Sequence, residues 1–170
     1  AELVNKQREP HLGRHSLDEV IPWAVQPVAV IAQAREVNFQ LLLSPDLPEI
    51  EMDAELVSEA VFQMAHNAVK FNKPGGEAKI RAFQADTMII IEVADTGIGL
   101  STERLEKLGL PFEQGADTLR RGQEGLGIGW AFVCYVAEVH NGWTHVESPG
   151  TGKGSTFSLA LRANSETPTQ

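Results

Sequence analysis

Several features of secreted and membrane-spanning proteins are missing from this sequence. Its 170 residues include a single cysteine, Cys134, so neither an intrachain disulfide nor a multi-cysteine metal site can form. The longest apolar run, residues 128–137, has ten residues and falls well short of the roughly 18 that a membrane-spanning helix needs. We therefore expect a segment in a reducing, cytoplasmic setting that does not insert directly into a membrane.

Positive charge is also scarce. The sequence has 14 lysines and arginines against 23 aspartates and glutamates, which gives a net charge of -9 at pH 7. Such a chain repels the phosphate backbone of nucleic acids, so we expect no nucleic-acid partner. Hydrophobic residues make up 42% of the chain, which is enough for a globular core, and the length suits a single domain.

The spacing of apolar residues predicts alternating helices and strands. Helices are expected at 17–37, 53–71, 102–108 and 127–140, and strands at 39–44, 79–84, 88–95, 143–148 and 155–162. Asp18 is a candidate N-cap for the first helix, in which Pro22 and Pro27 allow only a kinked or late-starting helix. Asp53 is the expected N-cap of the second helix, which has the clearest helical pattern.

The second helix has an apolar face, which is expected to pack on a core, and a polar face. Glu59, Gln63, Asn67 and Lys70 fall together on the polar face, at i, i+4, i+8 and i+11. Such a row is either a solvated surface or a binding surface. An amide oxygen is a good ligand for Mg²⁺ and a lysine one turn later can meet phosphate, so Asn67 and Lys70 are candidates for such a site.

Glycine is concentrated in the second half of the chain. Twelve of the 15 glycines lie between Gly97 and Gly154, where the backbone must move or approach something closely. Gly97 and Gly99 directly follow Asp95, which ends an apolar strand. Taken alone, the triplet Asp-Thr-Gly is either an aspartic-protease signature or a strand-ending turn. A protease needs a second such aspartate to share the proton, and the chain has no second copy.

A second glycine cluster, Gly125 to Gly129, directly precedes a helix-compatible stretch. Backbone N–H groups and a helix N-terminus could face an anion there. The cluster is not the dinucleotide fingerprint, because a long loop rather than a strand precedes it. The segment Gly152 to Ser155 fails as a P-loop, because Gly154 stands where Ser or Thr should follow the lysine. A nucleotide pocket in this chain would therefore be of another kind.

Five motifs together resemble the ATP-binding catalytic domain of two-component sensor histidine kinases. These kinases belong to a wider family of ATPases that includes DNA gyrase, the heat-shock chaperones and mismatch-repair proteins. In chain order the motifs are an N box (Gln63 to Asn72), a G1 box (Asp95 to Gly99), an F box (Pro111 to Glu113), a G2 box (Gly125 to Gly129) and a last-hairpin motif (Gly152 to Phe157). Each motif is weak alone, and their order and spacing carry the resemblance.

The resemblance implies a fold and a domain organisation. The expected fold is an α/β (α+β) two-layer sandwich of the Bergerat type, with a mixed, mostly antiparallel sheet and three main helices on one face. The ATPase domain would span 14–162. Residues 1–13 would be a remnant of the linker from a preceding dimerisation domain, and residues 163–170 a disordered tail.

The resemblance also implies roles for individual residues. Asn67 would coordinate the Mg²⁺ that bridges the ATP phosphates, and Gln63 and Lys70 would act in catalysis, with Lys70 adding positive charge. Asp95 would accept a hydrogen bond from the exocyclic amine of adenine. The other implied ATP-binding residues are Gly97, Ile98, Gly99, Phe112, Arg121, Gly125, Leu126, Gly127, Gly129 and Thr156.

Residues 109–125 would form a mobile ATP lid. Phe112 would pack this lid, and Arg120 or Arg121 would either reach the phosphates or remain solvated. Three further residues are of interest. Trp130 stands where a small aliphatic residue is common, and it either fills the core or touches the nucleotide. His66 either lines the pocket or has a capping or surface role, whereas His140 is expected to be structural.

Gln63 departs from the family pattern, which has Asn in histidine kinases and Glu in the hydrolytic relatives. A glutamine cannot act as a general base for water, and this favours phosphoryl transfer to a nucleophile such as a neutral imidazole. We expect a protein histidine kinase domain for two-component signalling that binds Mg-ATP and phosphorylates a His on a separate dimerisation domain, with a response regulator downstream. It would be cytoplasmic, either free or as part of a membrane-bound sensor. An anti-sigma-type serine kinase and a nucleotide-sensing module without transfer activity are the alternatives.

Overall fold

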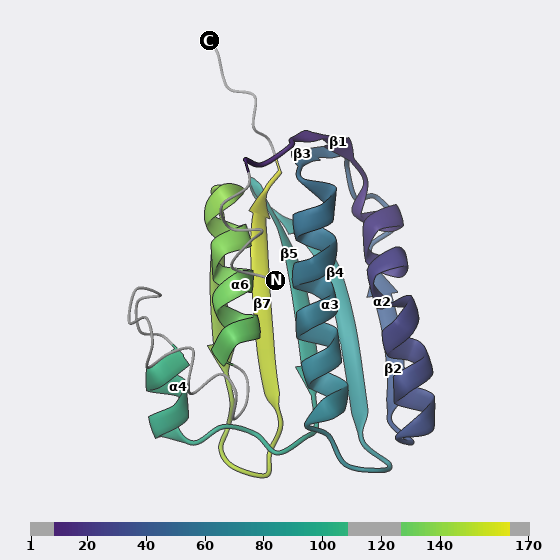
Figure 1. The fold of residues 1–170 in the computed structure, drawn as a ribbon, viewed down its shortest axis with the longest axis vertical. Helices are drawn as coiled ribbons and strands as arrows, with labels where there is room; N and C mark the ends of the chain where they lie inside the picture. Colours follow the sequence, from purple (N-terminus) through teal and green to yellow (C-terminus); the bar gives the residue numbers. More distant parts are fainter. Residues whose placement is uncertain (1–8, 109–126, 164–170) are drawn as a thin grey trace.

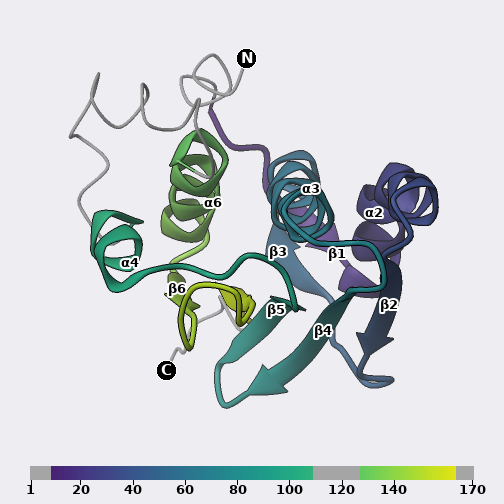
Figure 2. The same ribbon diagram turned by 90° about the horizontal axis from the view of Figure 1, so that it is seen from below.

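The computed structural model describes residues 9–108 and 127–163, which form both helices and strands (Figure 1). The elements are β1 (Gly13–His15), α2 (Leu17–Ala34), β2 (Asn38–Leu43), β3 (Ile50–Met52), α3 (Ala54–Lys70), β4 (Glu77–Ala85), β5 (Met88–Asp95), α4 (Thr102–Leu108), α6 (Gly127–Val139), β6 (Trp143–Glu147) and β7 (Ser155–Arg162). A five-stranded sheet forms one layer, and α2, α3 and α6 cover one of its faces (Figures 1 and 2). The two-layer architecture expected from the sequence is confirmed.

The sheet is mixed and mostly antiparallel, as predicted. Its strand order is β2-β4-β5-β7-β6, and only the β2–β4 pair is parallel. In the β5–β7 pair Asp95 lies opposite Ser155, which brings the glycine-rich segment after β5 beside the last hairpin. The strands β1 and β3 form a second sheet, which was not predicted from the sequence. Each of these strands has three residues, too few for an alternating pattern to be recognised.

The first helix, α2, corrects the expected N-cap and excludes the late start, which was one of the two alternatives that Pro22 and Pro27 left open. Its N-cap is Ser16 rather than Asp18, because the Ser16 hydroxyl accepts a hydrogen bond of 3.1 Å from the Asp18 N–H. The helix does not start late, since Pro22 and Pro27 both lie inside it. Because proline has no N–H, the carbonyl four residues before Pro27 lacks its helical hydrogen-bond donor. Pro27 is exposed, so this carbonyl can bond to water instead. None of the described helices, α2 included, has the length and apolarity to cross a membrane.

Asp53 and His140 connect the start of α3 to the end of α6 within the core. The Asp53 carboxylate caps α3, as predicted, by accepting from Leu56 N–H (3.1 Å), and it also accepts from His11 N–H (2.8 Å). The Asp53 N–H donates to Nε2 of His140 at 3.0 Å, and Nδ1 lies 2.8 Å from the Val136 carbonyl oxygen. Nδ1 therefore carries the proton of a neutral ring. Burial lowers the pKa of His140, so this histidine is structural, as expected.

Replacement of His140 by glutamine is expected to destabilise the domain by about 1–3 kcal/mol at pH 8, because buried hydrogen-bonding groups lose their partner. The lowered pKa of His140 means that the wild type is fully stabilised above the ordinary histidine value of about 6.5 and loses stability as the pH falls below it. His140→Gln should lack this part of the pH dependence in urea unfolding at pH 8, 6.5 and 5. The exposed His145 offers a matched control, and His145→Gln should unfold like the wild type. Equal pH dependence in His140→Gln and the wild type would contradict this role.

Candidate functional site

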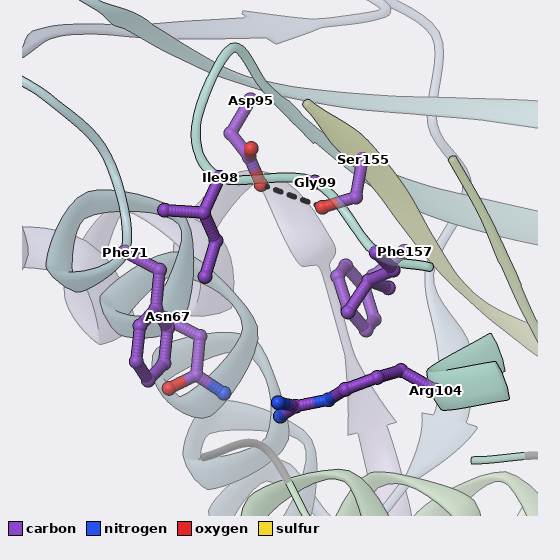
Figure 3. Close-up of a pocket in the computed structure, with 9 residues that line it drawn as sticks. Asn67, Phe71, Asp95, Ile98, Gly99, Arg104, Ser155 and Phe157 are labelled. Atoms are coloured by element: carbon purple, nitrogen blue, oxygen red, sulfur yellow. Dashed lines mark hydrogen bonds between the residues drawn. The ribbon is translucent and has the colours of Figure 1, made fainter. Parts of the chain in front are cut away.

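A pocket opens between the end of α3, the loop after β5, the start of β7 and helix α4 (Figure 3). It is open to solvent and has an empty volume of about 450 Å³. The residues that line it are Asn67, Phe71, Asp95, Ile98, Gly99, Leu100, Arg104, Ser155 and Phe157. Four of these, namely Asn67, Asp95, Ile98 and Gly99, were predicted as site residues from the sequence.

Asp95 is held in a fixed orientation at one end of the pocket. One carboxylate oxygen accepts from the Gly97 N–H at 2.8 Å, and the other accepts from the Ser155 hydroxyl at 3.1 Å. Partial burial raises the pKa of Asp95, and the two hydrogen bonds offset part of this effect. The site therefore contains a partly desolvated carboxyl group whose oxygens can accept one more hydrogen bond from a ligand.

The glycines around Asp95 allow three segments of backbone to meet. The Ile98 N–H donates to the Phe71 carbonyl at 3.1 Å, and the Gly154 N–H donates to the Gly97 carbonyl at 3.1 Å. A Cβ at Gly97 would lie 2.3 Å from the Phe71 oxygen, and one at Gly154 would lie 2.1 Å from the Asp95 oxygen. Only glycine fits at these two positions. The glycine clustering predicted that the backbone approaches something closely, and at these positions it approaches other backbone segments of the same chain.

The polar face of α3 turns partly away from solvent. Gln63 and Asn67 are half-buried and line a smaller pocket with Gly129 and Trp130, and Asn67 belongs to both pockets. A Cβ at Gly129 would lie 2.8 Å from the Gln63 Oε1, so the first turn of α6 packs directly on this face. The Gln63 Nε2 donates to Glu59 at 2.7 Å. A purely solvated surface therefore does not describe this face.

Among the described residues, the basic residue that lines the pocket is Arg104 and not the predicted Lys70. Lys70 is exposed and its Nζ lies 5.2 Å from the centre of the Phe71 ring, but it does not line the pocket. Arg104, which sequence reasoning missed, extends from α4 into the pocket toward Asn67 (Figure 3). The Ser101 hydroxyl accepts from the Arg104 N–H at 3.1 Å and fixes this turn. The only signal in the sequence is a basic residue shortly after the Gly97–Gly99 cluster.

Other predicted residues lie outside the pocket or outside the described residues. Thr156 is not in the pocket: Ser155 and Phe157 line it, and side chains alternate along a strand, so Thr156 faces the opposite side of the sheet. Gly127 is the first residue of α6. The calls on Phe112, Arg121, Gly125 and Leu126, and those on the linker before residue 9 and the tail after residue 163, fall on parts of the chain that the structure does not describe.

Two of the open questions on aromatic residues have answers. Trp130 fills the core, because it is 5% exposed and packs edge-on against Phe157 at 5.0 Å between ring centres; it also lines the smaller pocket, and a contact with the nucleotide stays a prediction. His66 lines neither pocket. It stacks on Phe62 at 5.3 Å between ring centres, which agrees with a surface role.

The sequence matches the model of a family described as histidine kinase-, DNA gyrase B-, and HSP90-like ATPase, over residues 52–165. The chain belongs to this ATPase family. The matched range includes every residue that lines the two pockets, from Gln63 to Phe157.

Curated relatives of this ATPase domain are much longer proteins. Histidine protein kinase DivJ of Caulobacter vibrioides is 34% identical over 143 residues, which are 84% of this chain and 24% of the relative. Sensor histidine kinase ZraS of Escherichia coli K12 is 28% identical over 166 residues, which are 96% of this chain and 34% of the relative. The chain thus spans about a quarter to a third of the length of these relatives.

Solved histidine kinase structures share the fold of this ATPase domain. The nucleotide-free catalytic domain of histidine kinase ThkA has a TM-score of 0.74 at 18% identity, over 90% of this chain and 98% of that chain. Full-length ShkA in complex with AMPPNP has a TM-score of 0.76 at 22% identity, over 95% of this chain and 33% of that chain. At these identities the likeness concerns the fold.

Asp95→Asn is expected to leave the stability of the nucleotide-free domain unchanged or higher at pH 7.5. Because burial raises the pKa of Asp95, its ionised form costs folding free energy, and the wild type should gain stability as the pH falls through the raised pKa. The asparagine variant lacks this cost, so its advantage in thermal unfolding should shrink as the pH is lowered from 7.5 through the raised pKa of Asp95. Asp86→Asn, in the exposed β4–β5 turn, is the control and should show no such advantage. A clear loss of stability in Asp95→Asn at pH 7.5 would contradict this assignment.

Proposed function

We propose that this chain is the ATP-binding catalytic domain of a sensor histidine kinase. It would bind Mg-ATP and present the γ-phosphate to a histidine on a separate dimerisation domain, from which a response regulator would be phosphorylated in the cytoplasm. The observation that carries the proposal is the pocket itself, with a partly buried carboxyl group, Asp95, at one end and Asn67 and Arg104 toward the other (Figure 3).

The Asp95 end of the pocket fits an adenine base. A carboxylate oxygen of Asp95 can accept a hydrogen bond from the exocyclic amine of adenine, and Ile98, Leu100 and Phe157 supply apolar walls for the flat ring. Guanine has an oxygen at the corresponding position, which would face the ionised carboxylate as a second acceptor. The site would therefore reject GTP, because neither acceptor could be satisfied.

The Asn67 end fits the phosphates and their metal ion. The Asn67 amide oxygen is suited to Mg²⁺, which keeps water and phosphate oxygens as its other ligands and neutralises charge during phosphoryl transfer. Asn67 would be the protein's ligand for this ion, since it is half-buried and lines both pockets. In a chain of net charge -9, Arg104 and the nearby Lys70 supply local positive charge for the polyphosphate.

Gln63 supports transfer rather than hydrolysis. Its side-chain amide donates to Glu59 and lies next to Gly129. With Asn67 it lines the smaller pocket, close to where the phosphates would lie. An amide cannot take a proton from an attacking water, whereas a neutral imidazole needs little activation as a nucleophile.

Two variants should separate binding of the base from binding of the phosphates. Asp95→Asn should weaken adenosine and Mg-ATP alike, by about tenfold to a hundredfold, because it loses a hydrogen bond to a charged group. Arg104→Gln should weaken Mg-ATP by about tenfold and leave adenosine unchanged. Calorimetry measures both, with Lys107→Gln on the same helix as the control, since Lys107 is exposed, pairs with Glu103 and does not line the pocket. Unchanged ATP affinity in Asp95→Asn would overturn the assignment of the pocket.

Phosphotransfer tests the kinase function directly. Labelled ATP, the domain and a helical-hairpin domain with an acceptor histidine should give acid-labile phosphate on that histidine, whereas the isolated domain should show little ATPase activity. Acid-stable phosphate on Ser or Thr would favour a serine kinase. Tight ATP binding without transfer to any partner would favour a nucleotide-sensing module. ATPase turnover that falls in Gln63→Ala would contradict the role given to Gln63.

A further inference from the structure

The outer side of α2 is an apolar face exposed to solvent. No charged residue occurs between Glu19 and Arg35. Trp23 is 71% exposed and Val30 is 69% exposed, and Pro27, between them, is exposed as well. The three residues follow each other at i, i+4 and i+7, which places them on one side of the helix. A helix face that remains in water normally carries charged side chains, so this face is expected to be covered in a complex.

A groove with an acidic rim adjoins this face. It lies between the first turns of α2 and α3, and its empty volume is about 640 Å³. Val20, Trp23 and Ser58 contribute to its surface, together with three glutamates, namely Glu19, Glu55 and Glu59. Among residues 9–108 and 127–163, no lysine, arginine or histidine lines it. None of its residues lines either of the two pockets near Asn67, although Glu59 accepts a hydrogen bond from Gln63, which lines the smaller one.

The charges of the groove select its occupant. Three carboxylates around an apolar floor attract lysine and arginine side chains whose stems or neighbours are apolar. The same carboxylates repel nucleic acid and anionic lipid. A second copy of the chain would bring these glutamates against one another. The basic groups of this helix pair, Arg35 and Lys70, lie at its other end, where Arg35 donates to the Lys70 carbonyl at 3.1 Å.

The shape of the surface fits a helix. α2 and α3 run side by side, and a groove between two helices accepts the ridge of a third (Figures 1 and 2). The exposed stripe from Trp23 to Val30 spans about 10 Å at the usual rise of 1.5 Å per residue, which corresponds to about two turns of a partner helix.

We propose that the α2–α3 groove and the adjoining Trp23–Val30 stripe dock a partner protein through a basic amphipathic helix. Trp23 inserts between apolar side chains of that helix, and Glu19 at the rim of the groove pairs with one of its lysines or arginines. Docking there leaves the nucleotide pocket open. The proposal therefore does not depend on the function proposed above.

Two synthetic peptides test this surface. One is a helical leucine–lysine repeat, and the other has the same leucines with glutamate in place of each lysine. The lysine peptide should bind the whole chain in fluorescence anisotropy, and its affinity should fall at least about tenfold in Trp23→Ser and in Glu19→Lys. High salt should also weaken it, and the glutamate peptide should not bind.

Trp143→Ser is the matched control. Trp143 is also an exposed tryptophan, 45% exposed on the edge strand β6, and its loss should leave peptide affinity unchanged. Circular dichroism should show that all three variants are folded. Equal binding by the wild type and Trp23→Ser, or no binding of the lysine peptide, would overturn the proposal. Trp23-dependent dimers in sedimentation, or Trp23-dependent binding to anionic lipid vesicles, would assign the surface to a second copy or to a membrane instead.

Discussion

The antiparallel pairing of β5 with β7 is the constraint on which the site depends. Asp95 and Ser155 are 60 positions apart in the chain, and this pairing sets them opposite each other so that the serine hydroxyl binds the carboxylate. The same register brings Gly154 against Gly97, where neither position has room for a side chain. Two glycine-rich segments thereby form one rigid wall, and the partly desolvated Asp95 gains a fixed direction for ligand recognition.

Helix α3 ties this wall to the rest of the domain. At its end, the carbonyl of the C-cap residue Phe71 accepts a hydrogen bond from the Ile98 N–H. At its start, Asp53 and His140 hold the first turn in the core. Between these two ends, the polar face of α3 meets the start of α6. The helix is therefore shared between core and pocket, and this arrangement sets Asn67 opposite the Asp95 end of the site.

Charge is distributed unevenly over this acidic chain. The proposed phosphate end of the pocket has Arg104, while the groove beside Trp23 has three glutamates and no basic residue from the described part of the chain. The two surfaces therefore favour ligands of opposite charge, a polyanion in the pocket and a basic helix in the groove. The same fold can thus keep a nucleotide and a protein partner apart by electrostatics as well as by distance.

The sequence by itself indicated the four described helices and the five strands of the main sheet, and Asp95 and Asn67 as candidate site residues, because apolar periodicity and glycine clusters are local signals. The mixed, mostly antiparallel sheet followed from the resemblance to the kinase family, and the short strands β1 and β3 were not predicted. Tertiary structure alone decided which side chains share the pocket. Arg104 enters it, while Lys70 remains outside and Thr156 faces the other side of the sheet. These placements depend on the β5–β7 register and on the direction of α4, and contacts between segments far apart in the chain leave no periodic trace in a single sequence.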